Sequence, residues 1–439
     1  MRRLLILVTA LALTLTGCGG LAEVSQKGGT ADRTPVTIEL WSFFTGREKG
    51  VVDRAVAGFH RKYPWITVKH VGGQNDDTMI QAVRAADPPD IELGQVTEAV
   101  PSYCSSGAWQ DLGPYLRRDH VDTGQFPAAT AGYTTGGGKR CAMPMLADTY
   151  GLYYNKALLA KAGFTHPPRT WEELTRMAER LTVRNPDGSI KVAGFVPFLD
   201  FYENNAQTVT AGWNLDWYAP DGTSALAHDP HWRQMLHWQR KLIDFYGYRD
   251  LQRFVTGVGK EFSSQNAFDT GRLAISVDGE WRSSFIAAEH SGLDYGTAPL
   301  PNTEPAHYGS GYLAGTTVGI PKGAHHPQAA WLLAHYLATD TSAQVSMARG
   351  LHNVPTTKAA LASPRVHDDP AFDTFLDIAA NPRSVSVPGT PAATAPKEAV
   401  TGFIQKWQSG AVPDLAAGLR GAARQVDGQI HQAKEGTAP

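Results

Sequence analysis

The chain has 439 residues and a formal net charge of −2, with 42% hydrophobic and 19% charged residues. This length allows roughly two to four domains and excludes a disulfide-stapled miniprotein, and the apolar content excludes a disordered chain. The absence of a Lys/Arg excess or of a long basic run argues against a nucleic-acid-binding protein.

The first seventeen residues have the pattern of a secretory signal. Arg2 and Arg3 precede one apolar stretch from Leu4 to Thr16, which is shorter than the about 20 residues needed to span a bilayer. The stretch ends in Leu15-Thr16-Gly17-Cys18, which resembles the bacterial lipobox. We therefore expect residues 1–17 to be a lipoprotein signal peptide and Cys18 to carry acyl chains such as palmitate. The alternative is an ordinary signal peptide that contains a cysteine.

The polar, glycine-containing residues 18–34 are typical of a flexible tether between the lipid and a folded region. An exported chain places Cys104 and Cys141 in an oxidising environment, where a pair of thiols usually forms a disulfide. Neither cysteine has the Cys-x-x-Cys or Cys/His neighbours of a zinc site. We therefore predict a Cys104–Cys141 disulfide and no metal site.

Strands and helices alternate in the first part of the predicted fold. Residues 36–41 alternate as a strand does, and apolar residues from Val51 to Phe59 recur at helical spacing before Pro64 ends the run. A second strand over residues 66–71, a helix over residues 79–86 and a third strand over residues 91–93 follow. This alternation predicts βαβ units and a mostly parallel sheet.

Further elements follow in the second half. Thr170 and Glu173 form a capping box at the start of a helix that continues to Leu181. Residues 185–188, Asn-Pro-Asp-Gly, predict a turn. Helical spacing recurs from Trp232 to Ile243 and from Trp331 to Ala338, residues 273–277 are expected to form a strand, and residues 397–432 a helical C-terminus.

The usual motifs of catalysis and cofactor binding are missing from the sequence. It contains no His-Glu-x-x-His zinc helix, no Gly-x-Ser-x-Gly nucleophile elbow and no P-loop. The segment Gly309 to Gly315 lacks the preceding strand of a dinucleotide-binding unit. Catalysis therefore has no support in the sequence, although a pair of glycosidase carboxylates depends on spatial separation and cannot be assessed by counting.

Several segments follow one another in order behind the lipobox: the strand ending at Trp41, Tyr63-Pro64, Pro89-Asp90-Ile91, Pro144 with Asp148, Leu152-Tyr153-Tyr154-Asn155-Lys156, Thr170-Trp171-Glu172-Glu173-Leu174, Gly271-Arg272-Leu273-Ala274, Gly279-Glu280-Trp281 and Pro299-Leu300-Pro301. Together they resemble the extracellular solute-binding lipoproteins of bacterial ABC sugar importers. The resemblance covers the whole mature chain.

This resemblance implies an α/β fold of two lobes, the type II periplasmic-binding-protein fold, with the ligand in a cleft between lobes joined by hinge segments. It implies an N-terminal lobe of residues 35–146 with 302–351 and a C-terminal lobe of residues 147–301 with 352–439. The expected protein is a monomeric receptor without cofactor, held at the outer face of the cell membrane by a lipid on Cys18. It would capture a sugar or oligosaccharide and deliver it to the permease subunits of an ABC transporter, with no enzymatic step.

The near-neutral net charge fits an uncharged ligand. Two alternatives to a sugar receptor stay open at this point, a secreted carbohydrate-active hydrolase and a binding protein for a non-sugar solute.

A sugar site needs flat aromatic rings for the C–H faces and fixed polar groups for the hydroxyls. The resemblance implies a stacking role for Trp281 and places Asp148 and Glu280 as acceptors of sugar hydroxyls. Trp41 and one of the tryptophans in the second lobe are equally suited to core packing. The ligand-binding residues that we expect are Trp41, Gln95, Asp148, Tyr150, Asn205, Trp213, Glu280, Trp281, Gly311 and Tyr312.

Overall fold

The structure is a computed structural model that describes residues 33–290 and 292–436. The leader, Cys18 and nearly all of the tether lie outside the described residues. From Val36 onward the described residues form one compact unit. The predicted lobe boundaries therefore stay a prediction.

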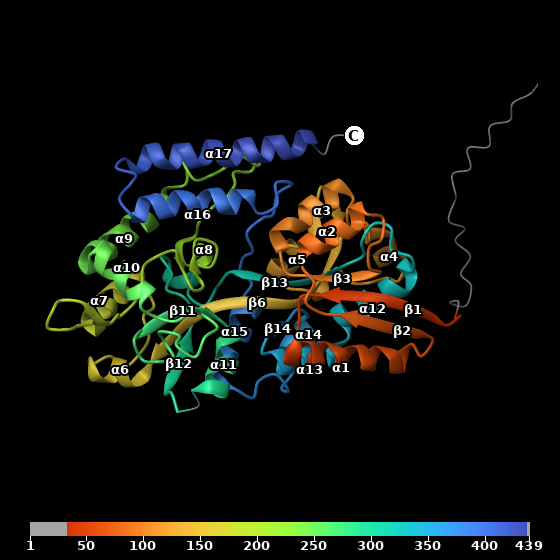
Figure 1. The fold of residues 1–439 in the computed structure, drawn as a ribbon, viewed down its shortest axis with the longest axis horizontal. Helices are drawn as coiled ribbons and strands as arrows, with labels where there is room; N and C mark the ends of the chain where they lie inside the picture. The colour runs from red at the N-terminus through yellow and green to blue at the C-terminus, as the bar shows by residue number, and fades with distance from the viewer. Residues whose placement is uncertain (1–32, 291, 437–439) are drawn as a thin grey trace, which may run out of the picture. The chain divides into compact units, whose positions relative to one another are not determined.

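The main sheet has eight strands, in the order β11-β6-β13-β3-β1-β2, with β12 and β14 also paired to β6 (Figure 1). Its strands are β1 (Val36–Ser42), β2 (Ile66–Val71), β3 (Ile91–Gly94), β6 (Ala142–Asn155), β11 (Ile275–Gly279), β12 (Tyr295–Ala298), β13 (Leu313–Gly319) and β14 (Val354–Pro355). Short hairpins are formed by β4 (Thr135–Gly136) with β5 (Lys139–Arg140), β7 (Val183–Arg184) with β8 (Ile190–Val192), and β9 (Asp200–Phe201) with β10 (Asn204–Asn205).

The expectation of a mostly parallel sheet is wrong. Only β1 with β2 and β1 with β3 pair in parallel, whereas β6 pairs antiparallel with β11, β12, β13 and β14, and β13 pairs antiparallel with β3. Helices connect the first three strands, as parallel pairing requires. Strand β6 is 14 residues long and pairs with strands from distant parts of the chain. No local sequence pattern specifies the direction in which those strands run.

Helices near the N-terminus cover both faces of the first strands (Figure 1). Asn75 begins α2 with a capping box, since its side chain accepts from the backbone N–H of Thr78 and the Thr78 side chain accepts from the backbone N–H of Asn75. The helices of this half are α1 (Gly46–Lys62), α2 (Asp76–Arg84), α3 (Val100–Ser106), α4 (Gly113–Arg118), α5 (Ala128–Gly132), α12 (Pro327–Thr339) and α13 (Thr341–Leu351), with 3-10 turns η1 (Thr97–Ala99) and η2 (Thr123–Gln125).

The remaining helices surround the other end of β6. As predicted, Thr170 caps α7 by accepting from the Glu173 backbone at 3.2 Å. The expected helical C-terminus is two helices, α16 and α17, which run side by side (Figure 1). The bounds are α6 (Lys156–Lys161), α7 (Trp171–Leu181), α8 (Thr210–Trp213), α9 (Pro230–Tyr246), α10 (Tyr248–Thr256), α11 (Arg282–Glu289), η3 (Pro305–His307), α14 (Lys358–Leu361), α15 (Pro370–Ala380), α16 (Ala395–Gln408) and α17 (Leu415–Gly436).

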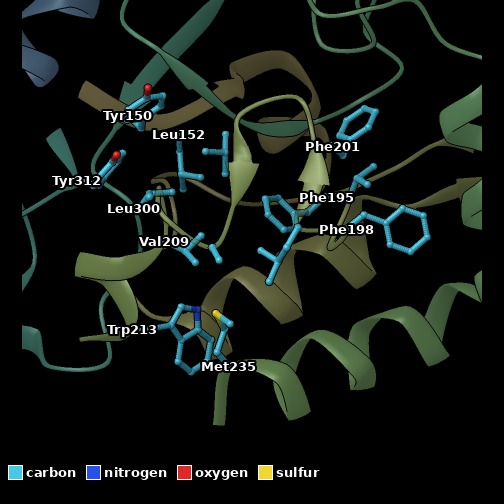
Figure 2. Close-up of a cluster of buried hydrophobic side chains, with 14 of the residues drawn as sticks. Tyr150, Leu152, Phe195, Phe198, Phe201, Val209, Trp213, Met235, Leu300 and Tyr312 are labelled. Atoms are coloured by element: carbon cyan, nitrogen blue, oxygen red, sulfur yellow. The ribbon is translucent and has the colours of Figure 1, made fainter. Parts of the chain in front are cut away.

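Buried side chains form two large clusters and one small cluster. One large cluster packs β1, β3 and the first part of β6 against α1, α12 and α13. The other packs the second part of β6 and β11 against α7, α9, α15, α16 and α17. Part of this second cluster is drawn in Figure 2, where the hydroxyl groups of Tyr150 and Tyr312 point away from the apolar side chains around Trp213.

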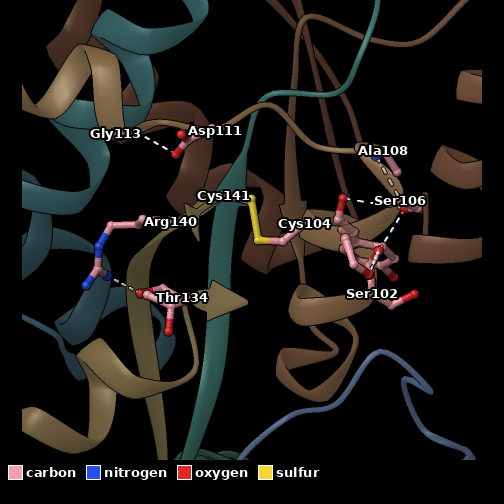
Figure 3. Close-up of a disulfide and its surroundings, with 12 residues drawn as sticks. Ser102, Cys104, Ser106, Ala108, Asp111, Gly113, Thr134, Arg140 and Cys141 are labelled. Atoms are coloured by element: carbon pink, nitrogen blue, oxygen red, sulfur yellow. Dashed lines mark hydrogen bonds between the residues drawn. A yellow bond between two sulfur atoms is a disulfide. The ribbon is translucent and has the colours of Figure 1, made fainter. Parts of the chain in front are cut away.

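The small cluster contains the disulfide (Figure 3). Cys104 lies in α3, and Cys141 immediately precedes β6, with 5.6 Å between their Cα atoms. Both side chains are buried. The predicted Cys104–Cys141 pairing is therefore confirmed.

Candidate functional site

The candidate site is a cavity of about 570 Å³ at the ends of several strands. Side chains that follow β1 and β3 line it, together with Asp148 of β6 and Trp281, which comes two residues after β11. Ligands of α/β proteins bind at such strand ends. The lining residues are Phe43, Phe44, Glu48, Gln95, Val96, Glu98, Asp148, Phe262, Trp281, Phe285, Thr316, Leu351, Asn353, Thr394 and Lys397.

Aromatic rings form much of the wall. Trp281 is half-buried and packs edge-to-face on Tyr150, with ring centroids 5.7 Å apart. Phe262 and Phe285 lie 5.4 Å apart, and Phe262 is 58% exposed. The indole Nε1 of Trp281 is buried, and its interaction with the Glu261 carboxylate opposes the rise in the pKa of that group. The wall thus offers flat apolar faces.

Two carboxylates share one amide at the floor of the cavity. Asn353 Nδ2 donates to Oδ1 of Asp148 at 2.9 Å and to Oε1 of Glu280 at 2.7 Å. The second oxygen of Glu280 accepts from the backbone N–H of Thr149 at 2.8 Å. Glu280 is fully buried and does not itself line the cavity. Its carboxylate is joined to the cavity wall by the side chain of Asn353.

Burial makes both carboxyl groups weak acids. Burial raises the pKa of Asp148 to about 7, although the hydrogen bond from Asn353 opposes the shift. Burial also raises the pKa of Glu280 well above its ordinary value, and the charge of Asp148 adds to the shift. Two close carboxylates are not ionised together at low cost. The pair therefore holds at least one proton near neutral pH.

Three buried tyrosines interact electrostatically with the same carboxylates. The hydroxyl of Tyr133 is buried and has no partner within the described residues. Burial raises the pKa of Tyr133, and the negative charge of Asp148 raises it further. Tyr150 and Tyr312 stack with centroids 5.6 Å apart. Burial is the main cause of the raised pKa of both; after it, Glu203 and Asp148 act on Tyr150, and Glu98 and Asp148 act on Tyr312.

Arg282 anchors the start of α11 directly after Trp281. Its side chain is 1% exposed and pairs with Asp278 at 2.8 Å, Asp269 at 3.4 Å and Glu261 at 3.9 Å. Burial raises the pKa of Asp269 to about 6 and that of Glu261 to about 7, and the arginine opposes both shifts. This network positions the helix that carries Trp281 and Phe285.

The cavity brings together three of the ten predicted site residues, Gln95, Asp148 and Trp281. Three more contact the residues that line the cavity or the layer behind them. Glu280 accepts a hydrogen bond from Asn353, Tyr150 packs on Trp281, and Tyr312 stacks on Tyr150. The ligand-binding role of all ten residues stays a prediction.

The other four predicted residues are placed elsewhere. Trp41 donates from Nε1 to Glu39 at 2.6 Å on its own strand, and Trp213 is 5% exposed and stacks on Trp171 at 4.7 Å. Asn205 accepts from the backbone of Gln207 and Thr208 in a turn. Gly311 allows close packing, since a Cβ atom there would lie 2.5 Å from Ile378.

The sequence reasoning missed Asn353 and most of the aromatic wall. Asn353 lies 205 and 73 residues from the two acids that it joins, and no local motif marks it. Phe43 directly follows the first strand, so its position at a strand end could have identified it as a candidate for the site. No strand end precedes Phe262 or Phe285 in this way.

Among residues 33–290 and 292–436, no group of three or more His, Cys, Asp or Glu side chains is arranged to hold a metal ion. No helix in the described part of the chain is long and apolar enough to cross a membrane.

Comparison with known proteins gives consistent results. The family model "Bacterial extracellular solute-binding protein" matches residues 54–374. A probable ABC transporter-binding protein of Deinococcus radiodurans is 27% identical over 221 residues, 48% of this chain and 50% of that protein. The maltodextrin-binding protein MdxE of Bacillus subtilis is 24% identical over 282 residues, 63% of this chain and 62% of that protein. The matches thus span only about half to two thirds of these relatives.

Solved structures share the fold over most of the chain. The structure of CpMnBP1 with mannotriose bound has a TM-score of 0.78 at 24% identity, covering 89% of this chain and 100% of that one. A likeness of this extent shows that the chain has the two-lobe α/β fold of these binding proteins.

Proposed function

The chain belongs to the bacterial extracellular solute-binding proteins, and we propose that it captures a sugar or oligosaccharide outside the cytoplasm and delivers it to the permease subunits of an ABC transporter. One observation carries the choice of a sugar: the cavity combines an aromatic wall around Trp281 with the half-buried carboxylate of Asp148. Aromatic faces stack on the C–H faces of sugar rings, and carboxylates accept hydrogen bonds from hydroxyls.

The free oxygen of Asp148 supports the same choice. Within the described residues only Oδ1 of this carboxylate accepts a hydrogen bond, and a polar atom without a partner costs free energy unless a ligand or water pairs with it. A sugar hydroxyl donates a hydrogen bond, so it supplies the partner that the second oxygen lacks. The names of similar proteins, which mention maltodextrin and mannotriose, agree with this class of ligand.

Calorimetric titration with a panel of neutral manno- and gluco-oligosaccharides tests the proposal. We expect saturable heat and a change in tryptophan emission with at least one of them. If no saccharide gives heat while another kind of solute does, the ligand class is wrong and the chain is a receptor for a non-sugar solute.

The family consists of binding proteins, and we propose that this member has no catalytic step. Asp148 and Glu280 form a carboxylate pair, but both contact the same Asn353 amide rather than standing free on opposite sides of a space for substrate and water. Recovery of an unchanged oligosaccharide after long incubation supports binding alone. Release of shorter products would favour the alternative, a secreted carbohydrate-active hydrolase.

Anchoring by lipid on Cys18 and a monomeric state complete the proposal. Two acyl chains suffice for stable membrane attachment. Expression of Cys18→Ser in a bacterial host should move the protein from the membrane fraction to the soluble fraction, with no incorporation of labelled palmitate. Unchanged membrane association of the variant would contradict the anchor.

A further inference from the structure

The charges that line the cavity are unbalanced. Three acids line it, Glu48, Glu98 and Asp148, against one base, Lys397. Lys397 Nζ lies 3.7 Å from Glu98 Oε1, so its charge is already matched. Behind the wall, Glu280 and Glu203 add two more buried carboxyl groups. The near-neutral charge of the whole chain therefore conceals a locally acidic site.

Hydrogen-bond acceptors also outnumber donors at Asp148. Only Oδ1 of this carboxylate accepts a hydrogen bond within the described residues, and its donor, Asn353, is shared with Glu280. The hydroxyl of Tyr133, a residue only 3% exposed, is unpartnered and feels the charge of Asp148. This buried hydroxyl is a further polar group that interacts with Asp148 and lacks a partner within the described residues.

A protonated amine matches these features better than a hydroxyl does. An ammonium has three donors, no acceptor and a positive charge, and it gains energy against the face of an indole such as Trp281. A neutral hydroxyl satisfies the free oxygen of Asp148 but does little to stabilise the ionised form of this buried carboxyl group, whereas an ammonium stabilises it directly. Simple polyamines would supply the charge but would leave the aromatic wall without a ring to stack on it.

We propose that the ligand is an amino sugar or an oligosaccharide of amino sugars, with one protonated amine held at Asp148 against the Trp281 side of the cavity. The inference rests on the proposed function, because it assigns a subclass of sugar to the same cavity.

Three trisaccharides of one skeleton test it by calorimetry at pH 6.5: the β-1,4-linked trimers of glucosamine, of glucose and of N-acetylglucosamine. We expect the glucosamine trimer to bind at least about tenfold more tightly than either of the others. In Asp148→Asn the ratio between the glucosamine and glucose trimers should fall towards one. Glu172→Gln, an exposed acid on α7, is the matched control and should keep the ratio.

If Asp148→Asn does not fold, proton release measured on the wild-type protein tests the same assignment. An ammonium that enters beside a carboxyl group holding a proton near neutral pH displaces that proton. Titration in buffers of different ionisation enthalpy should therefore show proton release with the glucosamine trimer and none with the glucose trimer. The titratable groups around Asp148 that take part in this balance are Glu280, Glu203, Tyr133, Tyr150 and Tyr312.

The outcomes separate the two proposals. If the glucose trimer or another neutral oligosaccharide binds as tightly as the glucosamine trimer, the amine assignment is overturned and the sugar receptor stands. A ratio that survives in Asp148→Asn together with absence of proton release also overturns it. If no saccharide binds and spermidine does, both the amine assignment and the sugar function fail.

Discussion

Asp148 and Glu280 share one donor, because Asn353 Nδ2 lies 2.9 Å from the first carboxylate and 2.7 Å from the second. One neutral amide thus holds together two acids that come from β6 and from the residue after β11. Charge repulsion between the acids opposes this arrangement, and the amide partly offsets it. The geometry of the cavity floor depends on this single side chain.

Replacement of Asn353 by alanine should therefore weaken both folding and sugar binding. Two buried carboxylates lose a hydrogen bond, which costs about 1–3 kcal/mol of the free energy of unfolding, and we expect sugar affinity to fall at least about tenfold. Urea unfolding and calorimetry measure the two losses. The control is Asn185→Ala, whose amide donates to Ser189 in a surface turn and should cost about 0.5 kcal/mol. Equal losses in the two variants would contradict the role given to Asn353.

The raised pKa of Asp148 predicts that its contribution to the free energy of unfolding changes with pH. Its pKa of about 7 in the folded state exceeds the unfolded value of about 3.9. The folded protein thus retains a proton that the unfolded chain has released between about pH 4 and pH 7. In this window the contribution of Asp148 to the free energy of unfolding falls as pH rises.

Asp148→Asn removes this titration. Relative to wild type, the variant should gain stability as pH rises from 4 to 8, with an upper limit of about 4 kcal/mol because each pKa unit corresponds to about 1.4 kcal/mol. The groups that share the titration are Glu280, Glu203, Tyr133, Tyr150 and Tyr312. Urea unfolding at each pH gives the difference. A difference that is constant with pH would show that Asp148 titrates normally.

Local sequence signals predicted the elements whose structure depends on local interactions. The alternation in residues 66–71 gave the bounds of β2, and Thr170 caps α7 as expected. The pairing of β6 could not be predicted in this way, because its partners β11, β12, β13 and β14 lie up to 209 residues away along the chain, from Leu146 to Pro355. Register between such distant strands is set by packing and not by local propensity.

The same distinction applies to the site. Trp281 could be chosen because family resemblance and its position after a strand both pointed to it, and Asp148 could be chosen from the resemblance; both line the cavity. Trp213 has the same residue type and lies in a similarly aromatic stretch, yet it stacks on Trp171 in the core. Composition alone cannot separate a stacking platform for a ligand from a core aromatic. That decision depends on which neighbours cover the ring.

Trp281 should be the main reporter of ligand binding. We expect Trp281→Ala to lower sugar affinity by about a hundredfold, as central aromatic residues do in binding sites, and to abolish the change in tryptophan emission. Trp281→Phe keeps a flat ring and should lose less affinity. Trp65→Phe is the control, because Trp65 packs on Tyr63 away from the cavity. An emission change that persists in Trp281→Ala would show that another tryptophan contacts the ligand.

The Cys104–Cys141 disulfide should stabilise the protein through the 37-residue sequence separation that it closes. The chain-entropy estimate for such a loop is about 3–4 kcal/mol, and the Cys104→Ser/Cys141→Ser double variant should lose stability of this order in urea. Both sulfur atoms should resist alkylation in the native, unreduced protein. Stoichiometric alkylation before reduction would contradict the disulfide.

Loss of the buried Arg282 side chain should be strongly destabilising. It is 1% exposed and compensates Asp278 and Asp269, so Arg282→Met leaves buried negative charge without a partner and should cost about 3–5 kcal/mol. Arg253→Ala breaks an ion pair in which the arginine side chain is 71% exposed and should cost less than about 1 kcal/mol.

The pH dependence of this loss distinguishes charge from packing. Asp269 has a pKa of about 6 with the arginine present, and removal of the positive charge raises that pKa further. At pH 5 the acid is mostly protonated and needs no cation, so the cost of Arg282→Met should be smaller at pH 5 than at pH 8. Adding Asp278→Asn to Arg282→Met should recover part of the stability. Equal losses at both pH values, without recovery in the double variant, would mean that Arg282 acts through the packing of its side chain against Phe262 and Phe285.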